Sequence, residues 1–129
     1  MNKVVEPARY LWPLPWTLVG LTLGLLGLLT GGKVQRRGPV LEFYGGFVTR
    51  LLKWIPNQPL AMTLGHTILG FSDSGLDKVR RHELVHVGQY ERWGPVFVPV
   101  YLFHSIRLWI AGKDAYHDNP FEIEAFRKE

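Results

Sequence analysis

The chain has 129 residues, a length that suits one domain. Hydrophobic residues make up 47% of it and charged residues 20%, which excludes a disordered chain. The absence of cysteine excludes disulfide frameworks, cysteine-rich structural zinc sites and thiol catalysis. Histidines and carboxylates are therefore the ligands left for a transition metal.

The formal net charge of +4 raises the question of a nucleic-acid partner. The basic residues are scattered along the chain rather than gathered in a dense run, and no nucleic-acid binding module is recognisable. We therefore expect no nucleic-acid partner. A modest positive charge suits the surface of an anionic membrane equally well.

Residues 10–32 contain no charged side chain and are long enough to cross a bilayer as a helix. Trp12 stands at one end, where aromatic residues gather at membrane interfaces, and Lys33 begins a basic flank at the other. We therefore predict that residues 1–33 form a hydrophobic N-terminal transmembrane helix. The alternatives are a cleaved signal peptide and a helix buried within the fold.

The same segment carries a row of glycines and an uneven basic flank. Gly20, Gly24 and Gly27 form a small-residue face at helical spacing, which allows close packing within this chain or against a partner. More basic residues follow the segment than precede it. The positive-inside rule then predicts a single-pass membrane protein with most of the chain on the cytoplasmic side. The basic residues compared are Lys33, Arg36, Arg37, Arg50 and Lys53 after the segment, and Lys3 and Arg9 before it.

The rest of the chain predicts an α+β fold, mostly helical with a short sheet. Apolar residues alternate between residues 60 and 69, which is typical of a strand and places His66 on its apolar face. Candidate N-caps at residues 72–75 begin a long helix, and Pro99 interrupts the next one. The predicted strands are residues 38–43 and 60–69, and the predicted helices are residues 47–55, 74–93, 96–111 and 121–128.

The long helix carries the sequence His82-Glu83-Leu84-Val85-His86. The two histidines are four residues apart, so they share one helix face and can bind one tetrahedral Zn²⁺. Glu83 sits beside the metal, where it can take a proton from zinc-bound water. These residues interrupt the apolar side of the helix, and burying them is costly unless a cation pairs with them. The sequence therefore predicts a zinc site.

A catalytic zinc needs a third protein ligand and leaves its fourth position for water. Positions 122 and 124 face different ways on one short helix, so only one of the two glutamates there can point at the metal. The sequence leaves several side chains open as the third ligand. They are Glu122, Glu124, His117, Asp118, His66 and His104.

Two stretches resemble the gluzincin clan of zinc peptidases, above all its very small minigluzincins and its membrane-bound members. They are residues 82–90 (His-Glu-Leu-Val-His-Val-Gly-Gln-Tyr) and residues 119–125 (Asn-Pro-Phe-Glu-Ile-Glu-Ala). The resemblance implies a small zincin-like metallopeptidase domain at residues 34–129. It implies a zinc metalloendopeptidase that acts on a peptide or protein substrate, with the strand at residues 60–69 lining the cleft and pairing with an extended substrate.

The resemblance also assigns roles position by position. His82 and His86 become zinc ligands, Glu122 becomes the third ligand and Glu83 the general base. Many members of the clan have Asp at the position of Phe126, where it orients a metal-binding histidine. We expect another residue to take that orienting role in this chain.

Tyr116 and His117 precede the last predicted helix and are the candidate donors to the charge that develops on the substrate carbonyl oxygen. Two other functions stay open. One is a non-catalytic, zinc-stabilised membrane scaffold or binding protein, and the other is a small membrane protein in which the His-Glu-x-x-His sequence is accidental. A structural zinc normally has four protein ligands, which distinguishes the scaffold from the enzyme.

Overall fold

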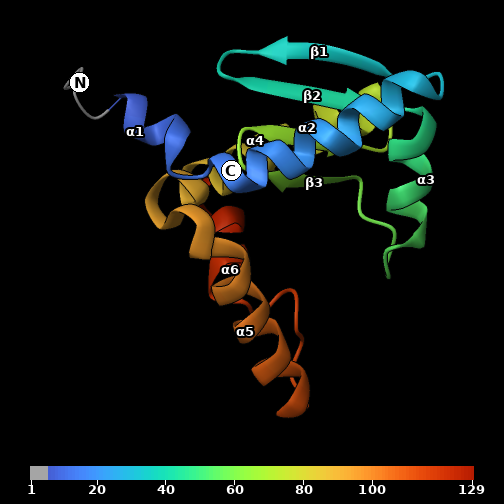
Figure 1. The fold of residues 1–129 in the computed structure, drawn as a ribbon. Coiled ribbons are helices and arrows are strands. Elements are labelled where there is room, and N and C mark those ends of the chain that lie inside the picture. The colour runs from blue at the N-terminus through green and yellow to red at the C-terminus, as the bar shows by residue number, and fades with distance from the viewer. Residues whose placement is uncertain (1–5) are drawn as a thin grey trace.

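A four-stranded sheet with helices on both of its faces organises the fold (Figure 1). The computed structural model describes residues 6–129, so the basic residue Lys3 lies outside the described residues. The predicted α+β class, mostly helical with a short sheet, is confirmed. In chain order the elements are α1 (Glu6–Leu11), α2 (Leu14–Leu29), β1 (Lys33–Arg37), β2 (Val40–Tyr44), α3 (Gly46–Trp54), β3 (Ala61–Leu64), β4 (Thr67–Gly70), α4 (Asp73–Trp93), α5 (Phe97–Ile110) and α6 (Pro120–Lys128).

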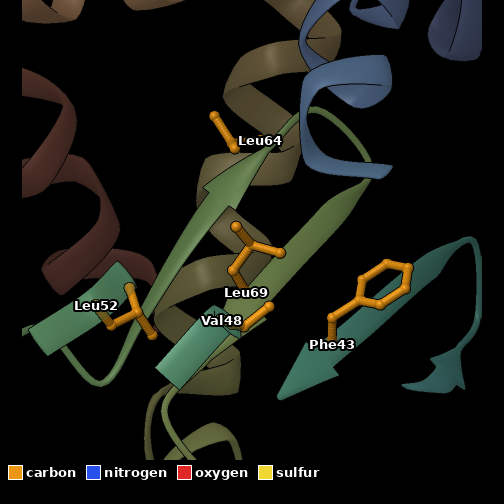
Figure 2. Close-up of a cluster of buried hydrophobic side chains, with 5 residues drawn as sticks. All are labelled: Phe43, Val48, Leu52, Leu64 and Leu69. Carbon is orange, nitrogen blue, oxygen red and sulfur yellow. The ribbon is translucent and has the colours of Figure 1, made fainter. Parts of the chain in front are cut away.

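The strands lie in the order β1-β2-β4-β3, with β2 and β4 parallel and the other two pairs antiparallel. Successive residues of a strand point to opposite faces of the sheet. On one face, Phe43 and Leu69 join an apolar cluster beneath α2 and α3 (Figure 2). On the other face, Val40 and Ile68 pack with Leu76 of α4. The sheet therefore lies between α2 and α3 on one side and α4 on the other.

The single strand predicted at residues 60–69 is wrong, because the chain reverses in its middle and forms two antiparallel strands, β3 and β4. Leu64 pairs with Thr67, so Gly65 and His66 form a two-residue turn. Gly65 has a φ of 62°, a left-handed conformation that glycine adopts without steric cost. As a result, β3 becomes the outermost strand on its side of the sheet.

The predicted helices lie close to their expected positions. The hydroxyl of Ser72 accepts a hydrogen bond from the Gly75 backbone N–H and caps α4. Pro99 does not interrupt α5, because it lies in the first turn, where a backbone N–H has no helical partner. The side chain of Asn119 accepts a hydrogen bond from the Phe121 backbone N–H and caps α6.

α2 packs against the sheet through its glycines. A Cβ atom added at Gly20 would lie 1.8 Å from the Thr67 hydroxyl oxygen, and one added at Gly24 would lie 2.6 Å from the Phe43 ring. The helix backbone therefore approaches the sheet more closely than a larger residue allows. The small-residue face that the sequence predicts thus packs within this chain.

The predicted transmembrane helix of residues 1–33 is not found among the described residues, where no helix is long and apolar enough to cross a membrane. α2 has 16 residues, with Pro13 before its first turn. Gly31, with a φ of 96°, lies just beyond its end and leads the chain into β1. The glycine face of α2 packs against the sheet, whereas large side chains on its other side are exposed, so α2 is not a fully buried helix either.

Gly24→Ala should lower the free energy of unfolding by about 1–3 kcal/mol, because the new methyl group overlaps the Phe43 ring. Gly88→Ala, within α4, is the matched control, since the space around its added Cβ is open. Alanine favours a helix over glycine, so this control should raise the free energy of unfolding by roughly 0.5–1 kcal/mol. Urea unfolding followed by circular dichroism measures both changes. Equal changes at the two positions would contradict the close packing of α2.

Candidate metal centre

Two helices bring His82, His86 and Glu122 together. The histidines lie about one turn apart on α4, and Glu122 lies in the first turn of α6, which packs against α4. The Nε2 atoms of His82 and His86 lie 2.8 and 3.0 Å from the same oxygen of Glu122, Oε1. One ligand atom from each residue lies within 4.8 Å of the other two, and all three side chains are buried. The spacing suits a single cation.

A second contact fixes the tautomer of His86. Its Nδ1 lies 2.7 Å from Oε1 of Gln89, while the Gln89 amide nitrogen donates to the Phe121 carbonyl and to Glu124. Because those two partners only accept hydrogen bonds, Gln89 must present its oxygen to His86, and the His86 Nδ1 carries a proton. The Nε2 atom of a neutral His86 ring then keeps its lone pair for a metal.

His82 is oriented by a residue that the sequence does not identify. Its Nδ1 lies 2.9 Å from Oε2 of Glu129, and the carboxylate oxygen accepts a hydrogen bond from the Nδ1–H group. Glu129 directly follows α6 and lies about two helical turns after Glu122, so both side chains lie on the side of α6 that faces α4. Phe126 packs its ring against His82, with 4.4 Å between the ring centroids. The outer nitrogen of His82 therefore meets the carboxylate of Glu129, whereas Phe126 contributes only a ring contact.

Glu122 is held by a further hydrogen bond, which the Tyr101 hydroxyl of α5 donates to its Oε2 atom. Burial raises the pKa of Glu122, but the hydrogen bonds from His82 and His86 outweigh burial and lower the pKa to about 2. Burial lowers the pKa of His86, but its contact with Glu122 outweighs burial and raises the pKa to about 9. The buried carboxylate therefore requires positive charge beside it, and a divalent cation would supply that charge in place of the imidazole proton.

Glu83 does not join the three converging side chains. It is buried, and its Oε1 accepts a hydrogen bond of 3.0 Å from the Thr63 hydroxyl of β3. Burial raises the pKa of Glu83 to about 6, and the neighbouring His86 partly offsets this rise. A buried carboxyl with a pKa near neutral is suited to accept a proton and return it.

The cluster and Glu83 lie on the wall of a cleft of about 770 Å³. Residues 61–64 of β3 line the cleft, together with side chains from α4, α5 and α6. Clefts of this size hold small ligands or short peptide segments. β3 is also an edge strand of the sheet.

Two of the other candidate ligands lie away from the cluster. Glu124 accepts hydrogen bonds from Gln89 and Arg92 of α4 and does not join the described cluster. His66 lies in the turn between β3 and β4, where its Nε2 is 2.7 Å from Glu91. His66 is therefore a buried histidine paired with Glu91, and it does not join the described cluster.

The connection between α5 and α6 carries most of the remaining candidates. His117 Nδ1 lies 2.9 Å from Oδ2 of Asp114, and Asp118 accepts a hydrogen bond from the Asp114 backbone N–H. His104, on α5, accepts a hydrogen bond from a neighbour on its own helix. None of the three joins the described cluster, although Tyr116 and His117 do line the cleft.

Four residues that shape the site were not predicted: Thr63, Gln89, Tyr101 and Glu129. Helical spacing could have predicted two of them. Gln89 follows His86 by three residues, and Glu129 follows Glu122 by about two helical turns. Thr63 and Tyr101 come from elements far from the motif in the sequence. Only the tertiary fold brings them to the cluster.

Comparisons of the chain with protein-family models, curated proteins and solved structures found no match. A buried His-His-Glu group alone does not distinguish one family or one metal from another. The function of the site is therefore inferred from its own residues and geometry.

Glu129→Ala should weaken zinc binding by about tenfold, since the His82 ring loses the acceptor that fixes its Nδ1 proton and its orientation. Lys128→Ala is the matched control, because this exposed neighbour pairs with Glu124 rather than with the cluster. Titration of the metal-free protein against a chelating zinc indicator measures both affinities. An unchanged affinity in Glu129→Ala would contradict the positioning role of this residue.

Proposed function

We propose that the protein is a zinc-dependent hydrolase of peptide bonds, with a small zincin-like domain. The observation that carries this proposal is the buried convergence of His82, His86 and Glu122 on a cleft wall that also holds Glu83. The His-Glu-x-x-His spacing and the gluzincin resemblance of residues 82–90 add support.

The donor set favours zinc as the metal. Two imidazole nitrogens and one carboxylate oxygen are ligands that Zn²⁺ takes in catalytic sites, whereas Ca²⁺ and Mg²⁺ prefer oxygen ligands throughout. A structural zinc site normally has four protein ligands, and the described cluster brings three together. The proposal therefore favours a catalytic centre over a metal-stabilised scaffold.

A divalent cation bound by the cluster would polarise a substrate carbonyl and lower the pKa of a water molecule. We assign Glu83 as the group that takes the proton from the attacking water and returns it to the leaving amine, because its pKa lies near 6. Thr63 holds the Glu83 carboxyl in place through its hydroxyl. Tyr116 and His117, which line the cleft, are the proposed donors to the charge that develops on the carbonyl oxygen.

An extended peptide suits this cleft because an edge strand runs along it. Added strands bind such an edge through backbone hydrogen bonds, which demand little of the substrate sequence. The side chains of Met62, Leu64, Val98 and Leu102 line the same cleft. We therefore expect a preference for apolar substrate side chains near the scissile bond.

Glu83→Gln should keep zinc and lower the rate of peptide hydrolysis by about 10²–10⁴-fold, because glutamine cannot take up the proton. Zinc content and the cleavage of a quenched-fluorescence peptide library measure the two properties. Asp77→Asn is the matched control, since this exposed acid on α4 pairs with Arg80 outside the cleft.

Three results would contradict the proposal in distinct ways. Unchanged turnover in Glu83→Gln would remove Glu83 from the reaction. A wild-type protein that binds zinc and cleaves no peptide would favour the scaffold. A wild-type protein that binds no zinc would overturn both.

A further inference from the structure

α2 turns its glycines toward the sheet and most of its leucines outward, while Trp16, Leu21 and Leu23 pack partly against the core. Its buried residues are Gly20, Gly24 and Gly27, which face the sheet. A helix packed against a core in water shows the reverse, with its large apolar side chains turned inward. The outward side of α2 carries no charge along the whole helix. The large apolar residues exposed there include Leu18, Val19, Leu25, Leu26, Leu28 and Leu29.

The threonine hydroxyl groups of α2 donate their hydrogen bonds to the helix backbone rather than to water. Thr22, on the exposed side, donates a hydrogen bond of 2.8 Å to the Leu18 carbonyl oxygen one turn earlier. Thr17 bonds in the same way to the Pro13 carbonyl oxygen. Hydroxyls satisfied by their own helix are suited to surroundings that offer no hydrogen bonds.

α5 carries a second exposed apolar face and projects away from the sheet (Figure 1). Phe97 and Leu108 mark its buried side. The opposite side is an uninterrupted apolar stripe, because its members recur three and four residues apart. Arg107 lies beside this stripe and is exposed. The stripe consists of Leu102, Phe103, Ile106, Trp109 and Ile110, the last two each 74% exposed.

A lipid surface fits these two faces better than a protein partner does. Protein interfaces surround an apolar centre with polar groups that hydrogen-bond across the interface, and the outward side of α2 offers none along its length. Trp12 is exposed before the start of α2, and Lys33 and Arg36 follow its end. Indole rings and basic side chains at the ends of an apolar face suit the headgroup region of a membrane. The net charge of +4 favours anionic lipids.

We infer that the apolar faces of α2 and α5 dock the protein on an anionic membrane surface. The large side chains enter the boundary between headgroups and acyl chains, and the flanking cations contact the headgroups. Because the glycine face of α2 is packed on the sheet, the helix lies along the membrane surface. The inference does not depend on a bound metal.

The docking face and the cleft share α5. Val98, Tyr101 and Leu102 line the cleft, and Leu102 also belongs to the exposed stripe. Docking through α5 therefore brings the cleft close to the membrane surface. If the proposed peptidase function holds, its substrates are peptide segments at that surface, a consequence that rests on the proposed function.

Flotation of the full chain with liposomes tests the docking. The vesicles are pure phosphatidylcholine, or phosphatidylcholine with about a quarter of the lipid replaced by anionic phosphatidylglycerol. The wild-type protein should float with the anionic vesicles and less with the neutral ones. The double variants Leu25→Ser/Leu29→Ser on α2 and Phe103→Ser/Ile106→Ser on α5 should each weaken the partitioning by about tenfold or more. Their circular dichroism should match the wild type, since these side chains are exposed.

Leu84→Ser is the matched control, because Leu84 is an exposed leucine on α4, across the sheet from α2, and should float like the wild type. Equal flotation of the wild type and both double variants would overturn the inference, as would no flotation with either vesicle. The inference would also be overturned if the wild type self-associates without lipid and the double variants do not. A second copy of the chain would then cover these faces. Metal-loaded and metal-free protein should float equally, which separates this test from that of the proposed function.

Discussion

The charge of Glu122, buried between three helices, is the constraint on which the candidate site depends. One of its oxygens meets both imidazoles of α4, and the other accepts a hydrogen bond from Tyr101 of α5. A carboxylate removed from water is stable only where hydrogen bonds and positive charge compensate it. The interactions that join α4, α5 and α6 therefore also create the place for a cation, so the packing of these helices and the chemistry of the site have one origin.

The sequence predicts best what depends on local spacing. The cap at Ser72 and the four-residue interval between His82 and His86 place both imidazoles on one face of α4, as the structure has them. The helix predicted at residues 121–128 likewise agrees closely with α6. Glu122 was predicted from the family resemblance, and its carboxylate lies beside the two histidines. Periodicity alone does not distinguish it from the other candidate ligands.

The features that the sequence does not predict depend on tertiary contacts. Residues 60–69 keep their alternating pattern through the turn at Gly65, because a two-residue turn preserves a period of two, and the pattern therefore hides the division into β3 and β4. β1 is polar and exposed and becomes a strand by pairing with β2. The apolar composition of α2 predicts a helix in contact with lipid. It does not predict that the glycine face of this helix packs closely against the sheet. Thr63 and Tyr101 reach the site only through the fold.

Anomalous X-ray diffraction at the zinc absorption edge, from crystals of the zinc-loaded protein, tests the metal centre most directly. We expect one zinc peak per chain, bonded to Nε2 of His82, Nε2 of His86 and the carboxylate of Glu122, with Glu83 outside the coordination sphere. Zinc bound at His66, or held by four protein ligands, would contradict a catalytic centre formed by these residues.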